Sequence, residues 1–414
     1  MSETYVIKGE LIDLDAEKKE IFLSYLYKSF EKMELSCETS GKSVDYYKGE
    51  TTLEDVYFMV KNDLKLQVDS SVINFVFKSF WSEEGVEYIE ITSDDPSDFW
   101  IMFIKEKITE ALASAFAQKM ETFFFREPFY YIGNKLDGDY YIQNWMISPA
   151  TPKVMEIFME ESAIYFNMSV EGINSNHARA KFETIGKEIM AILSVILSRG
   201  IYKGQHEVRW GCAKDSQTKA ELIEIGFRDD QPYPTEMPKK KRERLGEFEE
   251  PSKIHLFKSI NSNIKLPNNI RKLFRAYEGL SYDEKSAFLS AARMYQLALT
   301  LGRHNSTVKS SYQIAALDAL SKLIRENNKN KNAIISMVEK YSPSFKGEIG
   351  KLYDSVRSAH FHQGSFSKFD VNGIELGPFK GPASFLNEEA YTIDTIAREV
   401  LIGWLTDKIP DETP

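Results

Sequence analysis

The chain has 414 residues, of which 43% are hydrophobic and 13% aromatic, so it is globular, and its length predicts two or more domains. Its two cysteines, Cys37 and Cys212, match no CxxC or His/Cys ligand spacing, which argues against a disulfide framework and indicates a reducing, cytoplasmic compartment. The N-terminus has no export signal, and the longest apolar stretches, such as Ile189–Leu197, are too short to span a bilayer, so we expect no membrane partner.

The net charge of −10 is unevenly distributed along the chain. Residues 251–414 hold 22 Lys+Arg against 17 Asp+Glu, whereas the first 250 residues hold 30 against 45. Only the C-terminal part is therefore expected to attract phosphate groups without local help.

In chain order, the first 230 residues mix strand and helix patterns. We expect a strand within residues 1–14, a helix from Asp15 and a strand at 86–92. A long helix is expected over 99–125, before Pro128, followed by a hairpin that turns at 134–139. Further helices are expected at 152–166 and 178–198, with a late strand at 207–212. Residues 1–230 are therefore predicted to be an α+β region.

The aromatic run Phe123–Tyr131 has two interpretations. It is either a platform on which nucleic-acid bases stack or part of a packed core. The acidic surroundings and the many aromatic residues of this half favour packed core.

Residues 231–251 contain four prolines, a basic run at Lys239–Arg244 and then an acidic run. This composition is typical of a solvated linker, and we predict a domain boundary here. The basic run also has the charge to guide a nucleic-acid backbone.

After Pro251 nearly every segment has a helical pattern. Ser281–Glu284 is a capping box that opens one helix, and Pro343 ends another. Helices are expected at 268–277, 281–299, 310–326, 332–340, 347–360 and 387–408. Residues 252–414 are therefore predicted to form an antiparallel helical bundle.

Near the end of the 347–360 helix, Arg357 is followed five residues later by His362. This spacing within an all-α domain resembles the RxxxxH signature of the HEPN superfamily, and 352–362 is similar to the fourth helix of its ApeA-like branch from bacterial phage defence. Residues 312–323 resemble the preceding long helix of that family, with Asp318 where many members have glutamate. The resemblance covers about 280–408. It departs from the family at Ser358 and in the ending His362-Gln-Gly364.

The resemblance implies metal-independent RNA cleavage, with no cofactor, in a homodimer, and the residue types suit that chemistry. Abstracting a proton from the ribose 2′-hydroxyl needs a base with a pKa near 7, which suits His362. Charge that develops on the phosphate needs a permanent donor fork, which suits Arg357. Asp318 is expected to orient either group through a charge-assisted hydrogen bond.

Helix geometry leaves the identity of the base open. Positions 357 and 362 lie roughly 140° apart on an ideal helix, whereas 357 and 360 share a face, so His360 rivals His362. In the family the site forms where two such helices meet in a dimer, which would let His362 approach the partner's arginine. Local roles are the alternatives: an ion pair of Arg357 with Asp354, a helix-end role for His362 and a core position for His360.

The sequence thus predicts an α+β region at 1–230 that recognises an unknown trigger, a linker at 231–251, and a dimeric HEPN-type bundle at 252–414 that cuts RNA. A prokaryotic anti-phage or toxin-like role follows from the resemblance alone. The main alternative is a non-catalytic HEPN module for dimerisation or nucleotide binding. A metal site on His360 and His362 lacks an obvious third ligand, so none is expected.

Overall fold

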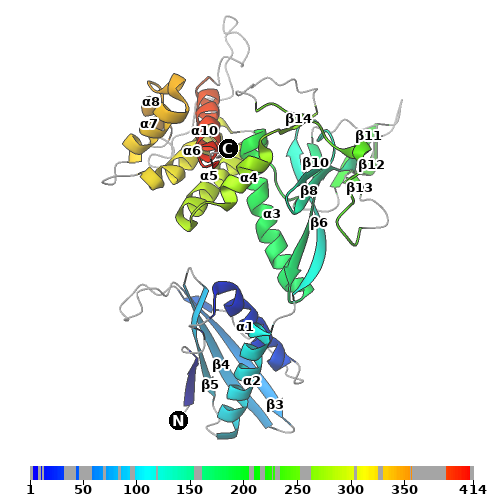
Figure 1. Cartoon of the computed structure of the whole chain (residues 1–414), viewed down its shortest axis with the longest axis vertical. Helices are drawn as coiled ribbons and strands as arrows, with labels where there is room; N and C mark the ends of the chain where they lie inside the picture. Colours follow the sequence, from blue (N-terminus) through cyan, green and yellow to red (C-terminus); the bar gives the residue numbers. More distant parts are fainter. Residues whose placement is uncertain are drawn as a thin grey trace, which may run out of the picture. The chain divides into compact units, whose positions relative to one another are not determined.

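The computed structural model describes most of the chain. The described residues are 3–7, 11, 14–31, 43–45, 58–68, 71–82, 85–93, 98–117, 120–152, 161–204, 209–214, 220–225, 227–228, 234–251, 263–302, 305–324, 330–354, 356 and 388–410. The chain forms two compact units, Met1–Glu121 and Thr122–Pro414 (Figure 1). Among the described residues no helix is long and apolar enough to cross a membrane.

The first unit is an antiparallel sheet with two helices. Its elements are β1 (Glu3–Ile7), α1 (Ala16–Glu31), β2 (Ser43–Asp45), β3 (Phe58–Val68), β4 (Ser71–Ser82), β5 (Gly85–Ser93) and α2 (Asp98–Phe116). The strand order is β1-β5-β4-β3-β2, so the first strand pairs with the last one. The strands and helix expected at 1–14, from Asp15 and at 86–92 are confirmed.

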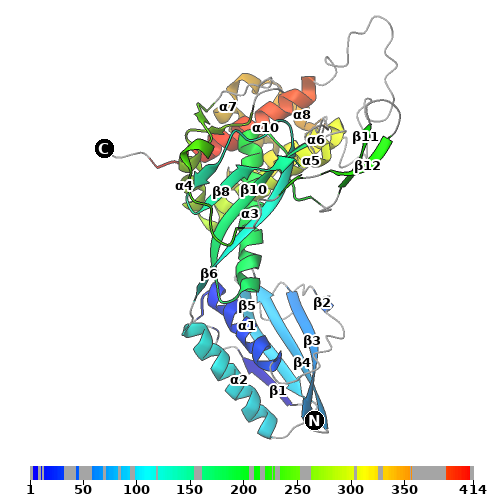
Figure 2. The ribbon, with the colours of Figure 1, turned by 90° about the vertical axis from the view of Figure 1, so that its right-hand side faces the viewer.

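The core of this unit is formed by apolar side chains that alternate with outward-facing residues along the strands. Phe77, Ile89 and Ile91 are almost fully buried, and successive strand residues point to opposite faces of a sheet. On α1 the buried residues include Phe22 and Leu26, spaced at i and i+4. Helix α1 packs against both α2 and β5, and Figure 2 shows the two helices beside the sheet.

The second unit combines a sheet with the helical region. Its strands are β6 (Glu121–Ile132), β7 (Tyr140–Ile142), β8 (Trp145–Pro149), β9 (Thr151–Pro152), β10 (Glu161–Gly172), β11 (Arg209–Lys214), β12 (Ala220–Ile225), β13 (Phe227–Arg228), β14 (Phe248–Glu249) and β15 (Leu266–Pro267). Its helices are α3 (Ser175–Leu197), α4 (Ile270–Glu278), α5 (Tyr282–Leu301), α6 (Ser306–Ser321), α7 (Asn330–Tyr341), α8 (Ile349–Tyr353) and α10 (Glu388–Thr406), with short 3-10 helices at η2 (Arg242–Arg244), η4 (Lys322–Ile324) and η5 (Pro343–Phe345).

Helix α3 joins the sheet to the helical region. The sheet order is β6-β10-β8-β7, and α3 packs against β10 as well as against α5. Phe182 contacts Phe125 and Phe166 on the sheet side, with ring centroids 5.2 and 5.3 Å apart. One hydrophobic core therefore runs from Phe125 to Leu405.

This shared core corrects the expected domain boundary. The compact units separate at Glu121/Thr122, not at 231–251, because the sheet and α3 pack on the C-terminal helices. Residues Ile189–Ile196 are all buried, and a helix that is apolar on every side needs neighbours on every side. Residues 1–121 carry 13 Lys+Arg against 25 Asp+Glu, so the acidic excess belongs to the first unit.

The long helix expected over 99–125 is shorter than predicted. Helix α2 ends at Phe116, and Glu121–Ile132 is strand β6. Pro128 lies within this strand, which is possible because β6 is at the edge of its sheet and needs hydrogen bonds on one side only. Phe125 and Phe129 are buried in the core, which confirms the packed-core interpretation of this aromatic run.

Two further expectations in this region are wrong. Strands β6 and β7 are not paired with each other, and the tight hairpin joins β7 to β8, where Gln143 adopts a positive φ of 51°. The helix expected at 152–166 does not form over its described part, because Glu161–Gly172 is strand β10 in the middle of the sheet.

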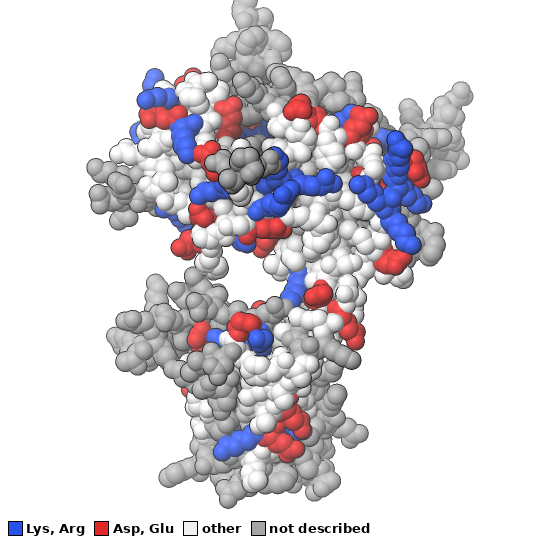
Figure 3. Space-filling view, in the orientation of Figure 1, with Lys and Arg blue, Asp and Glu red and all other residues white. Residues whose placement is uncertain are grey.

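The described part of the segment predicted as a linker is built into the second unit. We call residues 234–251 the strap. Its residue Arg244 accepts a hydrogen bond from the backbone of Asp139 (2.6 Å), and β14 at its end pairs with β15. In Figure 3, Lys and Arg side chains gather at the right-hand edge of the second unit, where Figure 1 draws the strap between β13 and β14.

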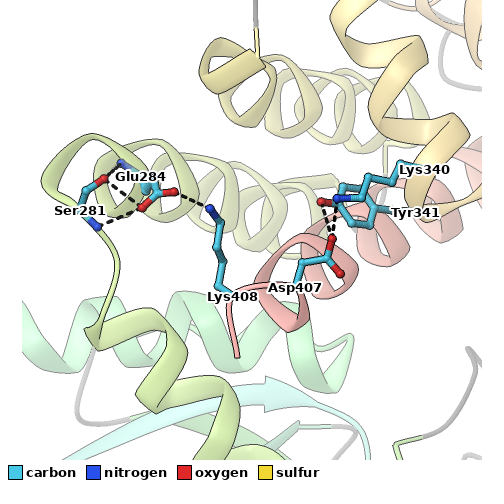
Figure 4. A network of polar contacts seen from close by, with 6 residues as sticks. All are labelled: Ser281, Glu284, Lys340, Tyr341, Asp407 and Lys408. Atoms are coloured by element: carbon cyan, nitrogen blue, oxygen red, sulfur yellow. Dashed lines mark hydrogen bonds and ion pairs between the residues drawn. The ribbon is translucent and has the colours of Figure 1, made fainter. Parts of the chain in front are cut away.

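Over the described residues the C-terminal helices agree with the sequence pattern, whereas residues 355 and 357–360 of the helix expected at 347–360 lie outside the described residues. The Ser281–Glu284 capping box is present, and Phe288 of α5 stacks on Trp404 of α10 at 5.6 Å. Surface contacts join the helix ends (Figure 4). Lys408 donates a hydrogen bond to the carboxylate of Glu284. The carboxylate of Asp407 accepts one from the hydroxyl of Tyr341 and forms an ion pair with Lys340, both at the end of α7. The C-terminal region is thus helical, as expected.

The contacts of Glu284 predict an acid-dependent contribution to stability. The hydrogen bond from Lys408, followed by those from Ser281, lowers the pKa of this carboxyl from 4.5 to about 2. Because the folded pKa is depressed, the contribution is fully present above about pH 4.5 and is lost as pH falls towards 2.

Urea unfolding between pH 2 and 6 tests this contribution. The free energy of unfolding of Glu284→Gln should lie closer to that of the wild type at low pH than at pH 6. As a control, Glu348→Gln removes an exposed carboxyl and should show no such convergence. A constant difference between Glu284→Gln and wild type over this range would contradict the prediction.

Candidate functional site

The four predicted site residues differ in what the structure shows of them. Arg357, His360 and His362 lie outside the described residues. Asp318 lies on α6 and is partly buried. The structure therefore locates one of the four, and the convergence of Asp318 with the other three stays a prediction.

The described helix that precedes Arg357 in the sequence, α8, is anchored to the helical core. In α8, Ile349, Leu352 and Tyr353 are buried on one face at spacing i, i+3, i+4. Asp354, just after α8, forms an ion pair with Lys331 of α7. One carboxylate oxygen of Asp354 is thus already paired with Lys331. This contact competes with the ion pair between Arg357 and Asp354 that the sequence offered as an alternative role for the arginine.

The described part of the helical region has a buried polar network around Asp394 of α10. Asp394 is buried, with 8% of its surface exposed. Its Oδ1 accepts hydrogen bonds from the hydroxyl of Tyr295 on α5 (2.9 Å) and the amide of Gln313 on α6 (2.6 Å). Its Oδ2 pairs with Lys309 of α6 at 3.1 Å. Three helices thus converge on one carboxylate.

The same network reaches the end of α3. The hydroxyl of Tyr295 lies 3.4 Å from that of Ser198, the C-cap residue of α3. One turn after Asp394, Arg398 donates to the backbone carbonyls of Val195 (3.0 Å) and Ile196 (2.6 Å). A guanidinium at this position adds side-chain hydrogen bonds to two carbonyls in the last turn of α3 and complements the helix dipole.

Electrostatics keep the central tyrosine protonated. Burial raises the pKa of Tyr295 well above its usual value, and the negative charge of Asp394 raises it further. Tyr295 therefore remains a hydrogen-bond donor throughout the physiological range. The pKa of Arg199, next to Ser198, is lowered mainly by burial. These properties suit a fixed structural network, because a general base must change its protonation state near neutral pH.

Asp318 lies away from this network. Asp318 is nine positions after Lys309 in the sequence, which places the two about 180° apart around α6 at roughly 100° per residue. The predicted orienting residue and the Asp394 network therefore occupy opposite sides of one helix.

The sequence contains a signal that Asp394 is buried, but an analysis of hydrophobic periodicity alone does not identify it. Ile393, Ile396 and Ala397 form an apolar stripe on α10, and Asp394 lies next to it. A charged residue beside such a stripe is buried unless it lies at the margin, so it requires a paired cation or several donors.

The described residues offer no room for a small ligand at the junction of the sheet and α3. A cavity there has a volume of about 10 Å³ and is lined by Tyr131, Arg199 and five aliphatic side chains. This volume admits one water molecule at most. Within the described ranges, no three His, Cys, Asp or Glu side chains are grouped to hold a metal ion.

Comparison with known proteins adds no relative. No protein-family model, no curated protein and no solved structure matches this chain.

Proposed function

We propose that the chain is a metal-independent endoribonuclease of the HEPN type. The observation that carries the proposal is the spacing of Arg357 and His362 in a helical C-terminal region. In this mechanism a histidine, His362 or His360, removes the proton of a ribose 2′-hydroxyl, which attacks the adjacent phosphate. Arg357 stabilises the charge on the phosphate oxygens, and Asp318 orients one of the two groups. The products carry a 2′,3′-cyclic phosphate and a 5′-hydroxyl.

The architecture supports this assignment of roles. The second unit contains the helical region and is close to neutral, with 39 Lys+Arg against 37 Asp+Glu, whereas the first unit is strongly acidic. RNA is repelled less by the second unit than by the first. We assign recognition of a trigger to residues 1–121, and dimerisation, which brings two Arg357 helices together, to the helical region. The setting we propose is prokaryotic defence against phage, or a toxin-like system, in the cytoplasm.

A non-catalytic HEPN module is the second candidate. Arg357 alone suffices for phosphate contacts, and the Asp394 network shows that much of the polar chemistry in the described helices serves structure. Such a module binds nucleotides or dimerises without cutting RNA.

The substrate requirement separates these candidates. We expect the purified full-length chain to cleave single-stranded RNA with undiminished rate in EDTA, because no metal ion takes part. An all-deoxy strand of the same sequence should remain intact, because it lacks the attacking 2′-hydroxyl. Gel electrophoresis gives the rates, and mass spectrometry of the products should show the 2′,3′-cyclic phosphate.

Two outcomes would contradict the proposal. Cleavage that stops in EDTA, or that also degrades the all-deoxy strand, requires a different mechanism. RNA that stays intact at every concentration of a folded dimer would support the non-catalytic module.

A further inference from the structure

The strap presents a run of cations on a fixed backbone. Lys239, Lys240, Lys241 and Arg242 are consecutive and exposed. Lys239–Arg244 contains five cations and one carboxylate. None of the first four cations makes an ion pair with a described residue, whereas Arg244 pairs with the buried Asp139 at 3.4 Å. Within the described part of the chain, these four cations are therefore available to an anionic partner.

Hydrogen bonds fix both ends of this run. Before it, the carbonyl of Pro238 accepts a hydrogen bond from the hydroxyl of Tyr141 (3.0 Å). After it, Gly246 donates to the backbone carbonyl of Asp139 (3.1 Å), and the carbonyl of Glu247 accepts from the Tyr140 hydroxyl (2.7 Å).

Two glycines permit this close approach. A side chain at Gly246 would overlap the ring of Tyr140, and one at Gly138 would lie 2.7 Å from the backbone of Arg244 and Gly246. The backbone of the strap is thus packed directly on the start of β7. Cations on a segment that is already ordered lose less conformational entropy on binding than cations on a free linker.

The strap also carries an exposed aromatic ring near its C-terminal end, and a second basic group lies beside that ring. Phe248 is 41% exposed, although Tyr140 holds it edge-on at 5.3 Å. The guanidinium of Arg271, on α4, lies 5.7 Å from the Phe248 ring and donates to the carbonyl of Tyr141 at 2.8 Å. Arg275 is also exposed on α4. At least one cation, the guanidinium of Arg271, thus borders the exposed ring.

We propose that the strap, with its exposed Phe248, forms a docking surface for single-stranded RNA. Its cations neutralise backbone phosphates, and Phe248 stacks on a base, the combination by which proteins bind single strands regardless of sequence. A lone ring gives weak membrane insertion, which favours nucleic acid over an anionic bilayer. The inference rests on the proposed ribonuclease function and names where its substrate is held outside the catalytic residues.

Binding of an uncleavable strand tests this surface. The probe is a fluorescein-labelled, single-stranded 2′-O-methyl RNA of about 20 nucleotides, longer than one single-strand site. Fluorescence anisotropy gives Kd at several salt concentrations for the full-length chain. The strap variant replaces Lys239, Lys240, Lys241 and Arg242 with glutamine. A control variant removes the same charge from four scattered, exposed residues, Lys135, Lys187, Lys322 and Lys346.

The strap variant should bind at least tenfold more weakly than the control variant. Its slope of log K against log salt should become shallower, by about 0.7 for each phosphate that the strap no longer neutralises. Phe248→Ala should weaken binding by about tenfold with an unchanged slope, because stacking releases no counterions.

Equal Kd values and slopes for the strap and control variants would overturn the inference. So would a strap variant that loses affinity only for vesicles containing phosphatidylserine. Failure of the proposed function is distinguishable: the wild type then binds the 2′-O-methyl strand through the strap but leaves RNA uncut. Conversely, cleavage with unchanged KM in the strap variant would reject the docking surface and leave the nuclease assignment standing.

Discussion

Arg357→Ala is expected to abolish detectable RNA cleavage in the full-length chain. Removing one donor to a developing oxyanion lowers kcat by about 10²–10³, and Arg357 is proposed to supply a bidentate pair. Arg357→Lys should retain part of the activity, because an ammonium keeps the charge but lacks the planar fork. Arg293→Ala, which removes an exposed guanidinium on α5, is the matched control and should cleave normally. Circular dichroism spectra and melting temperatures confirm that each variant folds.

The two histidine variants identify the base. Alanine at the base should lower the rate by about 10²–10⁴, whereas alanine at the other histidine should have a small effect. If His362 acts on the phosphate bound by the partner's Arg357, mixing the inactive Arg357→Ala and His362→Ala chains should restore part of the activity. If His360 acts with Arg357 of the same chain, mixing Arg357→Ala with His360→Ala should restore none.

Normal cleavage by Arg357→Ala would reject the site.

Local signals predicted the C-terminal helices well. A capping box and Pro343 mark helix limits through contacts within a few residues, so the sequence alone contains the information. Strand β6 was missed because consecutive aromatic residues have no period, and because Pro128 is acceptable only on an edge strand. Whether a strand lies at an edge is a property of the tertiary structure.

The strap shows that amino-acid composition does not predict whether a segment is ordered. Prolines and alternating charge blocks typically leave a segment without a core of its own, and residues 234–251 indeed bury little. Their order comes from backbone hydrogen bonds and from the close approach of Gly246 to the ring of Tyr140. Every residue type carries backbone donors and acceptors, so composition cannot reveal which of them will be paired.

The candidate site was predictable to a different degree. The sequence named residue types suited to RNA cleavage, but which histidine approaches the phosphate depends on how two helices meet, which no local pattern specifies. The Asp394 network depends on residues from α5, α6 and α10 that are up to 99 positions apart in the chain. The sequence indicates only that Asp394 needs partners. It does not identify them.

Asp394→Ala is expected to destabilise the second unit by about 2–4 kcal/mol, because removing this buried carboxylate leaves two buried hydrogen-bond donors without an acceptor and the half-buried Lys309 without its counter-charge. Lys309 would lose its carboxylate, and Tyr295 and Gln313 would each lose a hydrogen-bond acceptor within the core. Urea unfolding followed by circular dichroism gives the free energy. The control is Asp407→Ala just after the same helix, whose exposed pair with Lys340 should contribute about 0–1 kcal/mol.

A double-mutant cycle separates the ion pair from the hydrogen bonds. Lys309→Met together with Asp394→Asn should cost less than the sum of the two single changes, since neither charge then remains unpaired. Tyr295→Phe should cost about 1–2 kcal/mol, because Asp394 keeps its other two partners. If Asp394→Ala were no more destabilising than Asp407→Ala, the network would not hold α5, α6 and α10 together. The helical region would then depend on its apolar core alone.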